Sequence, residues 1–214
     1  METGEIRINT LMAAMTALLS VEVFMGLIAP ENPSERLAML GAGRMMETGT
    51  LLYIVRHWGQ GLGSIGLSAS KTGEGIRKGL IWSLVFGITA LGCGFVLYSF
   101  GMNPLSLVAS GMPINTKEVW LLLLVGGVIG PVTEEVFFRG ICYGFFRKWG
   151  IAAALILTTA VFTAAHSHGS GIPITQAIGG IVFAVAYELE QNLLVPVIIH
   201  VTGNLAIFGA SLYA

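Results

Sequence analysis

Two carboxylates and a guanidinium stand together behind an uncharged run of the sequence. Glu134 and Glu135 follow residues 119–133, which carry no charge, and Arg139 comes four positions after Glu135. On a helix, an acid and a base at i and i+4 are neighbours, and this order suits an ion pair. Glu134 points about 100° away from Glu135, which leaves it free for other chemistry. Because ionisable residues are costly inside a membrane span, each of these is a candidate functional residue.

Two histidines and an asparagine follow in later apolar segments. His166 ends one such segment, and His200 and Asn204 lie four residues apart in the last one, which puts them on one helix face. A carboxylate and a histidine can hold a water molecule and take its proton. A second histidine and an amide can donate hydrogen bonds to the oxyanion formed when that water attacks a carbonyl. We therefore expect Glu134 and these three residues to share one site that can hydrolyse an amide bond.

Each of these residues taken alone also has a structural explanation. A buried pair such as Glu135 and Arg139 can hold helices in register without reacting, and a single histidine in a span usually forms an interhelical hydrogen bond. A structural pair needs only one acid, so the second carboxylate, Glu134, favours a reactive site. The remaining polar residues near the spans are interpreted as surface, rim, structural or interfacial groups: His57, His168, Glu22, Tyr187, Glu188 and Glu190.

The three motifs resemble those of the CAAX-protease and bacteriocin-processing family, also called the Abi family, which includes the Ras-converting endopeptidases. The family pattern is Glu-Glu-x-x-x-Arg, then Phe-x-x-x-His, then His-x-x-x-Asn or His-x-x-x-Asp, on successive membrane helices. The resemblance covers about residues 75–210. In this sequence the motifs are Glu134-Glu135 to Arg139, Phe162 to His166, and His200 to Asn204.

The resemblance implies a role for each matching residue. Glu134 is expected to act as the base on water with His166 beside it, and His200 and Asn204 as oxyanion donors. The ion pair of the first motif is expected to support the site. The substrate is then a peptide or protein with a membrane-associated segment; the family acts on prenylated tails, bacteriocin leaders and sorting tails, and the sequence does not select among them.

The catalytic type stays open at the level of sequence, because the family has been described both as metallopeptidases and as metal-independent glutamate peptidases. Glu134, His166 and His200 could bind zinc with water in the open position. The compact His-Glu-x-x-His of zinc peptidases is absent. This absence favours a site without a cofactor, with zinc as the alternative.

Other protease types fit the sequence less well. The chain contains no Asp, which excludes a di-aspartyl site. The stretch 168–171, His-Gly-Ser-Gly, only superficially resembles a serine-protease motif, so a serine enzyme is a minor alternative. A competing class is a non-catalytic membrane protein, either a transporter or an assembly partner, that uses the same polar core.

The composition indicates an integral membrane protein whose solvent is the lipid bilayer. Of the 214 residues, 54% are hydrophobic and 11% are charged, against roughly 25% charged residues in soluble domains. The uncharged stretches 79–116, 149–187 and 191–214 each exceed the ~20 residues that span a hydrocarbon core. A net charge of −1 argues against a nucleic-acid partner, because such binding needs a basic face to neutralise phosphates.

We expect an all-α, polytopic transmembrane bundle of about seven spans, because a lipid-exposed backbone must satisfy its own hydrogen bonds. One membrane-embedded domain, residues 1–214, is sufficient for this arrangement. The distribution of lysine and arginine places the N-terminus in the cytoplasm by the positive-inside rule. The spans are expected near residues 9–29, 37–55, 79–100, 119–145, 150–166, 174–190 and 193–213.

Overall fold

A computed structural model describes residues 6–108, 111–167 and 173–212. These residues form helices and connecting turns without a strand, which confirms the predicted all-α fold. The α-helices are α1 (Ile8–Leu27), α2 (Pro33–His57), α3 (Thr72–Ser99), α4 (Thr116–Leu124), α5 (Gly130–Glu135), α6 (Gly144–Phe146), α7 (Ile151–Ala165), α8 (Ile174–Glu190) and α9 (Leu194–Ser211). Shorter 3-10 or π-helical turns are η1 (Leu62–Ile65), η2 (Ala69–Lys71), η3 (Pro104–Leu107), η4 (Val125–Ile129), η5 (Val136–Tyr143) and η6 (Arg147–Trp149).

Each of the seven expected spans coincides with a helical segment, with ends that differ by a few residues. The fourth expected span is one continuous helical rod built from α4, η4, α5, η5, α6 and η6. Among the described residues, four segments are long and apolar enough to cross a membrane: Ile8–Leu27, Leu62–Ser99, Thr116–Trp149 and Leu194–Ser211. Helix α2 is not among them, and α7 is apolar but shorter.

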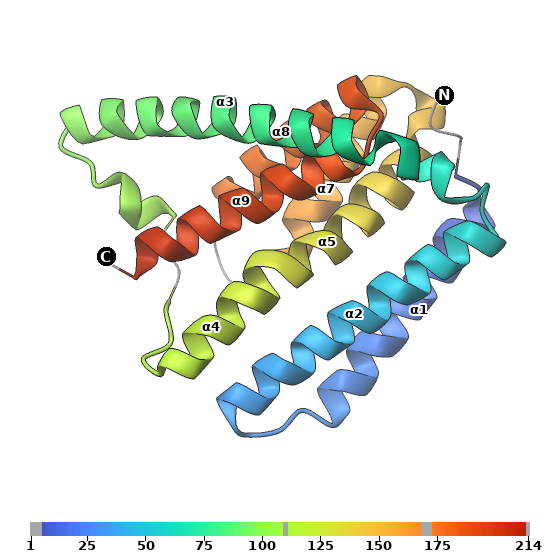
Figure 1. Cartoon of the computed structure of the whole chain (residues 1–214), viewed down its shortest axis with the longest axis horizontal. Helices are drawn as coiled ribbons and strands as arrows, with labels where there is room; N and C mark the ends of the chain where they lie inside the picture. The colour runs from blue at the N-terminus through green and yellow to red at the C-terminus, as the bar shows by residue number, and fades with distance from the viewer. Residues whose placement is uncertain (1–5, 109–110, 168–172, 213–214) are drawn as a thin grey trace.

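The central rod lies between two groups of helices (Figure 1). Helices α1 and α2 form an antiparallel hairpin on one side of it, and α9 runs beside it on the other. Helix α3 packs along α9, and α7 packs along α8. The centre of the bundle therefore contains the rod segment that carries the Glu-Glu-x-x-x-Arg motif.

Small residues bring α3 close to α9. A Cβ added at Gly79 would lie 2.8 Å from the Cβ of Ile198, closer than real side chains approach. A Cβ added at Gly75 would lie 2.6 Å from the Nδ2 of Asn192, an amide that donates to the carbonyl of Lys71 at 3.0 Å. Small residues at helix contacts allow such close approach inside membranes. These contacts fix the position of α9, which carries two of the candidate site residues.

Ion pairs join the ends of helices far apart in sequence. Arg147 Nη2 lies 2.9 Å from Glu188 Oε1, and Tyr143 donates to the same carboxylate at 2.8 Å. At the end of α3, Lys78 Nζ lies 2.7 Å from Glu190 Oε2. Glu188 and Glu190 thus have the structural role that was expected for them.

Candidate active site

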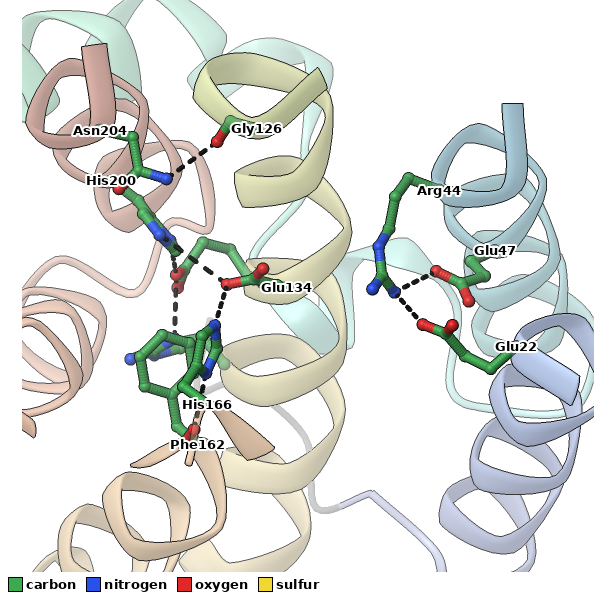
Figure 2. Close-up of polar contacts among 11 residues, drawn as sticks. Glu22, Arg44, Glu47, Gly126, Glu134, Phe162, His166, His200 and Asn204 are labelled. Atoms are coloured by element: carbon green, nitrogen blue, oxygen red, sulfur yellow. Dashed lines mark hydrogen bonds and ion pairs between the residues drawn. The ribbon is translucent and has the colours of Figure 1, made fainter. Parts of the chain in front are cut away.

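Two π-helical turns shape the rod where the site lies. The amide of Gly130 bonds to the carbonyl of Val125, five residues back. The next hydrogen bond of this type would run from the amide of residue 131 to the carbonyl of Gly126. Residue 131 is a proline, which has no N–H to donate, so this bond cannot form. Asn204 of α9 supplies the donor instead, with its Nδ2 atom 2.9 Å from the Gly126 oxygen (Figure 2). The local sequence of the rod therefore creates an acceptor that anchors the amide side chain of Asn204.

A fully buried ion pair lies one turn further along the rod. Arg139 Nη1 is 2.9 Å from Glu135 Oε1, and both side chains are 0% exposed. This is the i,i+4 pair expected from the sequence. The other end of the guanidinium donates to the carbonyl of Gly180 at 3.2 Å, and its carbon lies 4.6 Å from the centre of the Phe162 ring. The charge of Arg139 is thus held by one carboxylate, one carbonyl and an aromatic face.

The same carboxylate also contacts the first histidine of α9. His200 Nδ1 lies 2.7 Å from Glu135 Oε1, and the imidazole stacks on Phe183 with ring centres 4.6 Å apart. A carboxylate paired with arginine accepts hydrogen bonds and has none to donate, so Nδ1 of His200 carries the proton. The Nε2 atom then points to the side of the site on which Glu134 lies, at 3.8 Å from Glu134 Oε2.

The second histidine reaches Glu134 from the end of α7. His166 Nε2 lies 3.5 Å from Glu134 Oε2, and its Nδ1 atom lies 2.8 Å from the carbonyl oxygen of Phe162. A carbonyl only accepts, so Nδ1 of His166 is protonated as well. Both distances to Glu134 exceed the ~2.7–3.2 Å of a direct hydrogen bond. The carboxylate oxygen and the two Nε2 atoms are thus grouped around one point without bonding directly to one another.

Figure 2 shows Glu134, His166, His200 and Asn204 in one region of the bundle, and the contacts of Glu135 with His200 and with Arg139 join the other two residues singled out from the sequence to it. Glu134 is 23% exposed and His166 is 26% exposed, whereas His200 is buried. The contact between His200 and Glu135 was missed, because spacing along one helix does not say which other helix faces it. The six residues singled out from the sequence are Glu134, Glu135 and Arg139 of the rod, His166 at the end of α7, and His200 and Asn204 of α9.

Two other histidines were expected to be surface or rim residues. His57 is exposed at the end of α2, with its ring 4.6 Å from that of Tyr53. His168 and the stretch 168–171 lie outside the described residues.

Glu134, His166 and His200 are residue types that can bind a metal ion. Within the described ranges, no group of three His, Cys, Asp or Glu side chains has the geometry of a metal site. The chemistry of the set still suits zinc, because each imidazole presents Nε2 toward Glu134 and is oriented through Nδ1 by an oxygen, a common arrangement around zinc-bound histidines. The residues that would hold such an ion are Glu134, His166 and His200.

Comparison with known proteins supports the resemblance drawn from the motifs. Residues 116–206 match the family model "Type II CAAX prenyl endopeptidase Rce1-like". The chain is 29% identical over 112 residues to "Membrane-embedded CAAX protease MroQ" of Staphylococcus aureus (strain USA300), which is 49% of this chain and 45% of the relative. It is 33% identical over 92 residues to "Uncharacterized 24.3 kDa protein" of Escherichia coli, covering 40% of this chain and 42% of the relative.

These matches cover only part of this chain and of each relative, which limits what they show about the function of this protein. The matched stretch spans less than half the length of either relative. No solved structure matches the chain significantly. The predicted resemblance to the CAAX-protease family is nevertheless confirmed, and the matched residues 116–206 contain all three motifs. The chain is accordingly similar to membrane-embedded proteases.

Proposed function

We propose that this protein is a glutamate-type intramembrane endopeptidase that cleaves a peptide bond in a membrane-associated substrate. The observation that carries the proposal is the grouping of Glu134 Oε2 with the Nε2 atoms of His166 and His200, at 3.5 and 3.8 Å. The match to a prenyl endopeptidase family supports a lipid-modified or otherwise membrane-bound peptide as the substrate.

The proposal includes a set of protonation states around Glu134. A water molecule between the three atoms has two hydrogens, which go to Glu134 and to the lone pair of neutral His166. His200 already uses its Nδ1 hydrogen on Glu135, so it donates at Nε2 only as an imidazolium. With Glu134 and Glu135 negative and Arg139 and His200 positive, the four charges sum to zero. Such a balanced set avoids an isolated charge at membrane depth.

The reaction follows from these roles. Glu134 takes a proton from water while the water oxygen forms a bond to the substrate carbonyl carbon. The electron pair displaced to the carbonyl oxygen is held by Nε2–H of His200 and by the second hydrogen of the Asn204 amide, whose first hydrogen goes to Gly126. When the C–N bond breaks, protonated Glu134 returns its proton to the leaving nitrogen.

The decisive experiment is turnover by purified protein in liposomes. The probe is a fluorophore–quencher peptide that ends in a farnesylated CAAX tail, and its hydrolysis is followed by fluorescence. E134Q is expected to lose activity by at least about 10²-fold while expression and thermal unfolding stay unchanged. The matched control is E118Q on the same rod, where the carboxylate accepts from Ser34 at 3.1 Å and normal turnover is expected. Undiminished cleavage by E134Q would reject the assignment.

A second measurement identifies the natural substrate. The membrane proteins and secreted peptides of cells with the native chain are compared with those of cells with E134Q. Peptides that appear only with the native chain mark the cleavage site. Identical profiles, together with no hydrolysis of the farnesylated probe, would favour the non-catalytic membrane protein.

A further inference from the structure

A second polar cluster lies on the N-terminal hairpin, outside the matched residues 116–206. Arg44 Nη1 on α2 is 2.7 Å from Glu22 Oε1 of α1 and 2.7 Å from Glu47 Oε2, one helical turn further on. The Glu47 side chain is 2% exposed, whereas that of Arg44 is 27% exposed. The contact with Glu47 lies within α2, whereas the contact with Glu22 joins α2 to α1.

Helix α2 is fixed against the rod next to Glu134. The hydroxyl oxygens of Thr48 and Thr133 lie 2.7 Å apart, and each is 2.9 Å from the carbonyl oxygen of Arg44. Thr133 directly precedes Glu134. Figure 2 shows the Arg44 guanidinium on the side of α2 that faces the rod. Arg44 therefore faces the rod segment that carries Glu134.

The guanidinium of Arg44 has donors to spare. Both ion pairs use Nη1, and within the described part of the chain no hydrogen bond or ion pair uses Nε or Nη2. Arginine presents five N–H donors in a rigid plane. The free edge of this guanidinium can therefore take one more acceptor on the side of the catalytic carboxylate.

The charge of the cluster selects the kind of acceptor. Arg44 contributes +1 and its two glutamates contribute −1 each, so the cluster carries a net charge of −1. A further carboxylate would be repelled by this surplus. A neutral carbonyl oxygen would not, and an extended peptide offers one every ~3.3 Å along its length.

We propose that Arg44 is a substrate-binding residue whose free edge holds a main-chain carbonyl oxygen of the peptide substrate. The proposal rests on the endopeptidase function, because it places the substrate beside Glu134. It assigns part of substrate recognition to the N-terminal hairpin.

Two variants of Arg44 separate binding from folding. R44K keeps the cation for both glutamates but loses the planar second edge. R44Q/E47Q removes one positive and one negative charge, so the net charge is unchanged and the buried Glu47 carboxylate is not left unpaired; the carboxylate that loses its ion pair is that of Glu22, which is 46% exposed. The matched controls are R56K and R56Q, at the exposed C-terminal end of the same helix. Thermal unfolding of each protein confirms that it is folded.

Binding and turnover are measured with the farnesylated probe peptide. Its Kd is read by fluorescence anisotropy on protein that also carries E134Q, and its KM and kcat on protein with Glu134 intact. R44K and R44Q/E47Q are expected to raise Kd and KM by about tenfold or more with kcat nearly unchanged, while the Arg56 variants match the parent protein. Equal Kd and KM in all variants would overturn the proposal.

Peptide analogues provide a readout that a purely structural role would not change. Replacing one amide at a time by an alkene removes a single carbonyl; one position is expected to lose about tenfold in affinity with Arg44 present and nothing with R44K. A uniform loss at every position, or a loss that depends only on the terminal carboxylate, would refute carbonyl binding.

Arg44-dependent binding without hydrolysis would reject the protease function and keep this inference. Hydrolysis with Arg44-independent binding would do the reverse, and no binding of the peptide would reject the inference.

Discussion

Glu135 Oε1 accepts from two groups at once, from His200 Nδ1 at 2.7 Å and from Arg139 Nη1 at 2.9 Å. One carboxylate oxygen therefore links a fully buried ion pair to an imidazole that faces Glu134. This link gives the second glutamate of the motif a part in orienting His200 in addition to neutralising Arg139. The two parts can be separated by mutation.

E135Q is expected to affect stability and turnover through different partners. It leaves the buried guanidinium of Arg139 without a counter-charge, which should lower the free energy of unfolding by about 3–5 kcal/mol. The double variant E135Q/R139M removes both charges and should recover most of that loss, as measured by denaturant titration in mixed micelles. Its kcat should stay about 10²-fold or more below the parent value, because the imidazolium of His200 lacks an anionic partner. Recovery of both quantities would show that Glu135 is only structural.

The two histidines are expected to differ in their effect on stability. H166A should reduce kcat by about 10²–10⁴-fold with little change in unfolding, because His166 is 26% exposed and its Nδ1 partner is a carbonyl of its own helix. H200A should reduce kcat as well, and also lower the free energy of unfolding by about 1–3 kcal/mol, since it removes a buried partner of Glu135. Equal destabilisation by both substitutions would contradict these surroundings.

Asn204 can be compared with a second asparagine that lies outside the site. N204A should lower kcat by about 10²–10³-fold with KM nearly unchanged, because the amide is needed only when the oxyanion forms. N192A removes the amide that donates to the Lys71 carbonyl, so it should cost about 1–3 kcal/mol of stability and leave kcat of the folded protein unaltered. A reduced kcat in N192A would show that the contrast is not specific to the site.

Metal removal distinguishes the two catalytic types. Protein dialysed against EDTA and then assayed in metal-free buffer is expected to retain full turnover, and elemental analysis is expected to find no stoichiometric zinc. The physical reason is that Glu134, with His166, can activate water without a cation. Loss of activity on dialysis, restored by added Zn²⁺, would instead assign Glu134, His166 and His200 as zinc ligands.

Close packing of α3 on α9 is expected to be sensitive to a single methyl group. G79A should lower the free energy of unfolding by about 1–3 kcal/mol, because the new Cβ would lie 2.8 Å from the Ile198 Cβ. G87A on the same helix is the control, since nothing lies within 4 Å of a Cβ added there. The measurement is thermal unfolding of both variants, and similar midpoints would contradict the close contact between α3 and α9.

The sequence by itself determined the helical class and the approximate ends of the helices. Long apolar runs leave the backbone no other way to satisfy its hydrogen bonds in lipid. It also determined the pair between Glu135 and Arg139 and the common face of His200 and Asn204, because helix geometry fixes what lies four residues apart. The single-domain organisation and the cytoplasmic N-terminus stay predictions, since charge patterns suggest them but no contact tests them.

Only the tertiary structure decided which helices face each other. The contacts of His200 with Glu135, of Asn204 with Gly126 and of Arg44 with Glu22 each join residues from separate helices. The periodicity of one helix gives the direction of a side chain about that helix axis, and nothing about the neighbour it meets. That neighbour depends on how glycines, prolines and side-chain volumes let the helices pack, which is a property of the whole bundle.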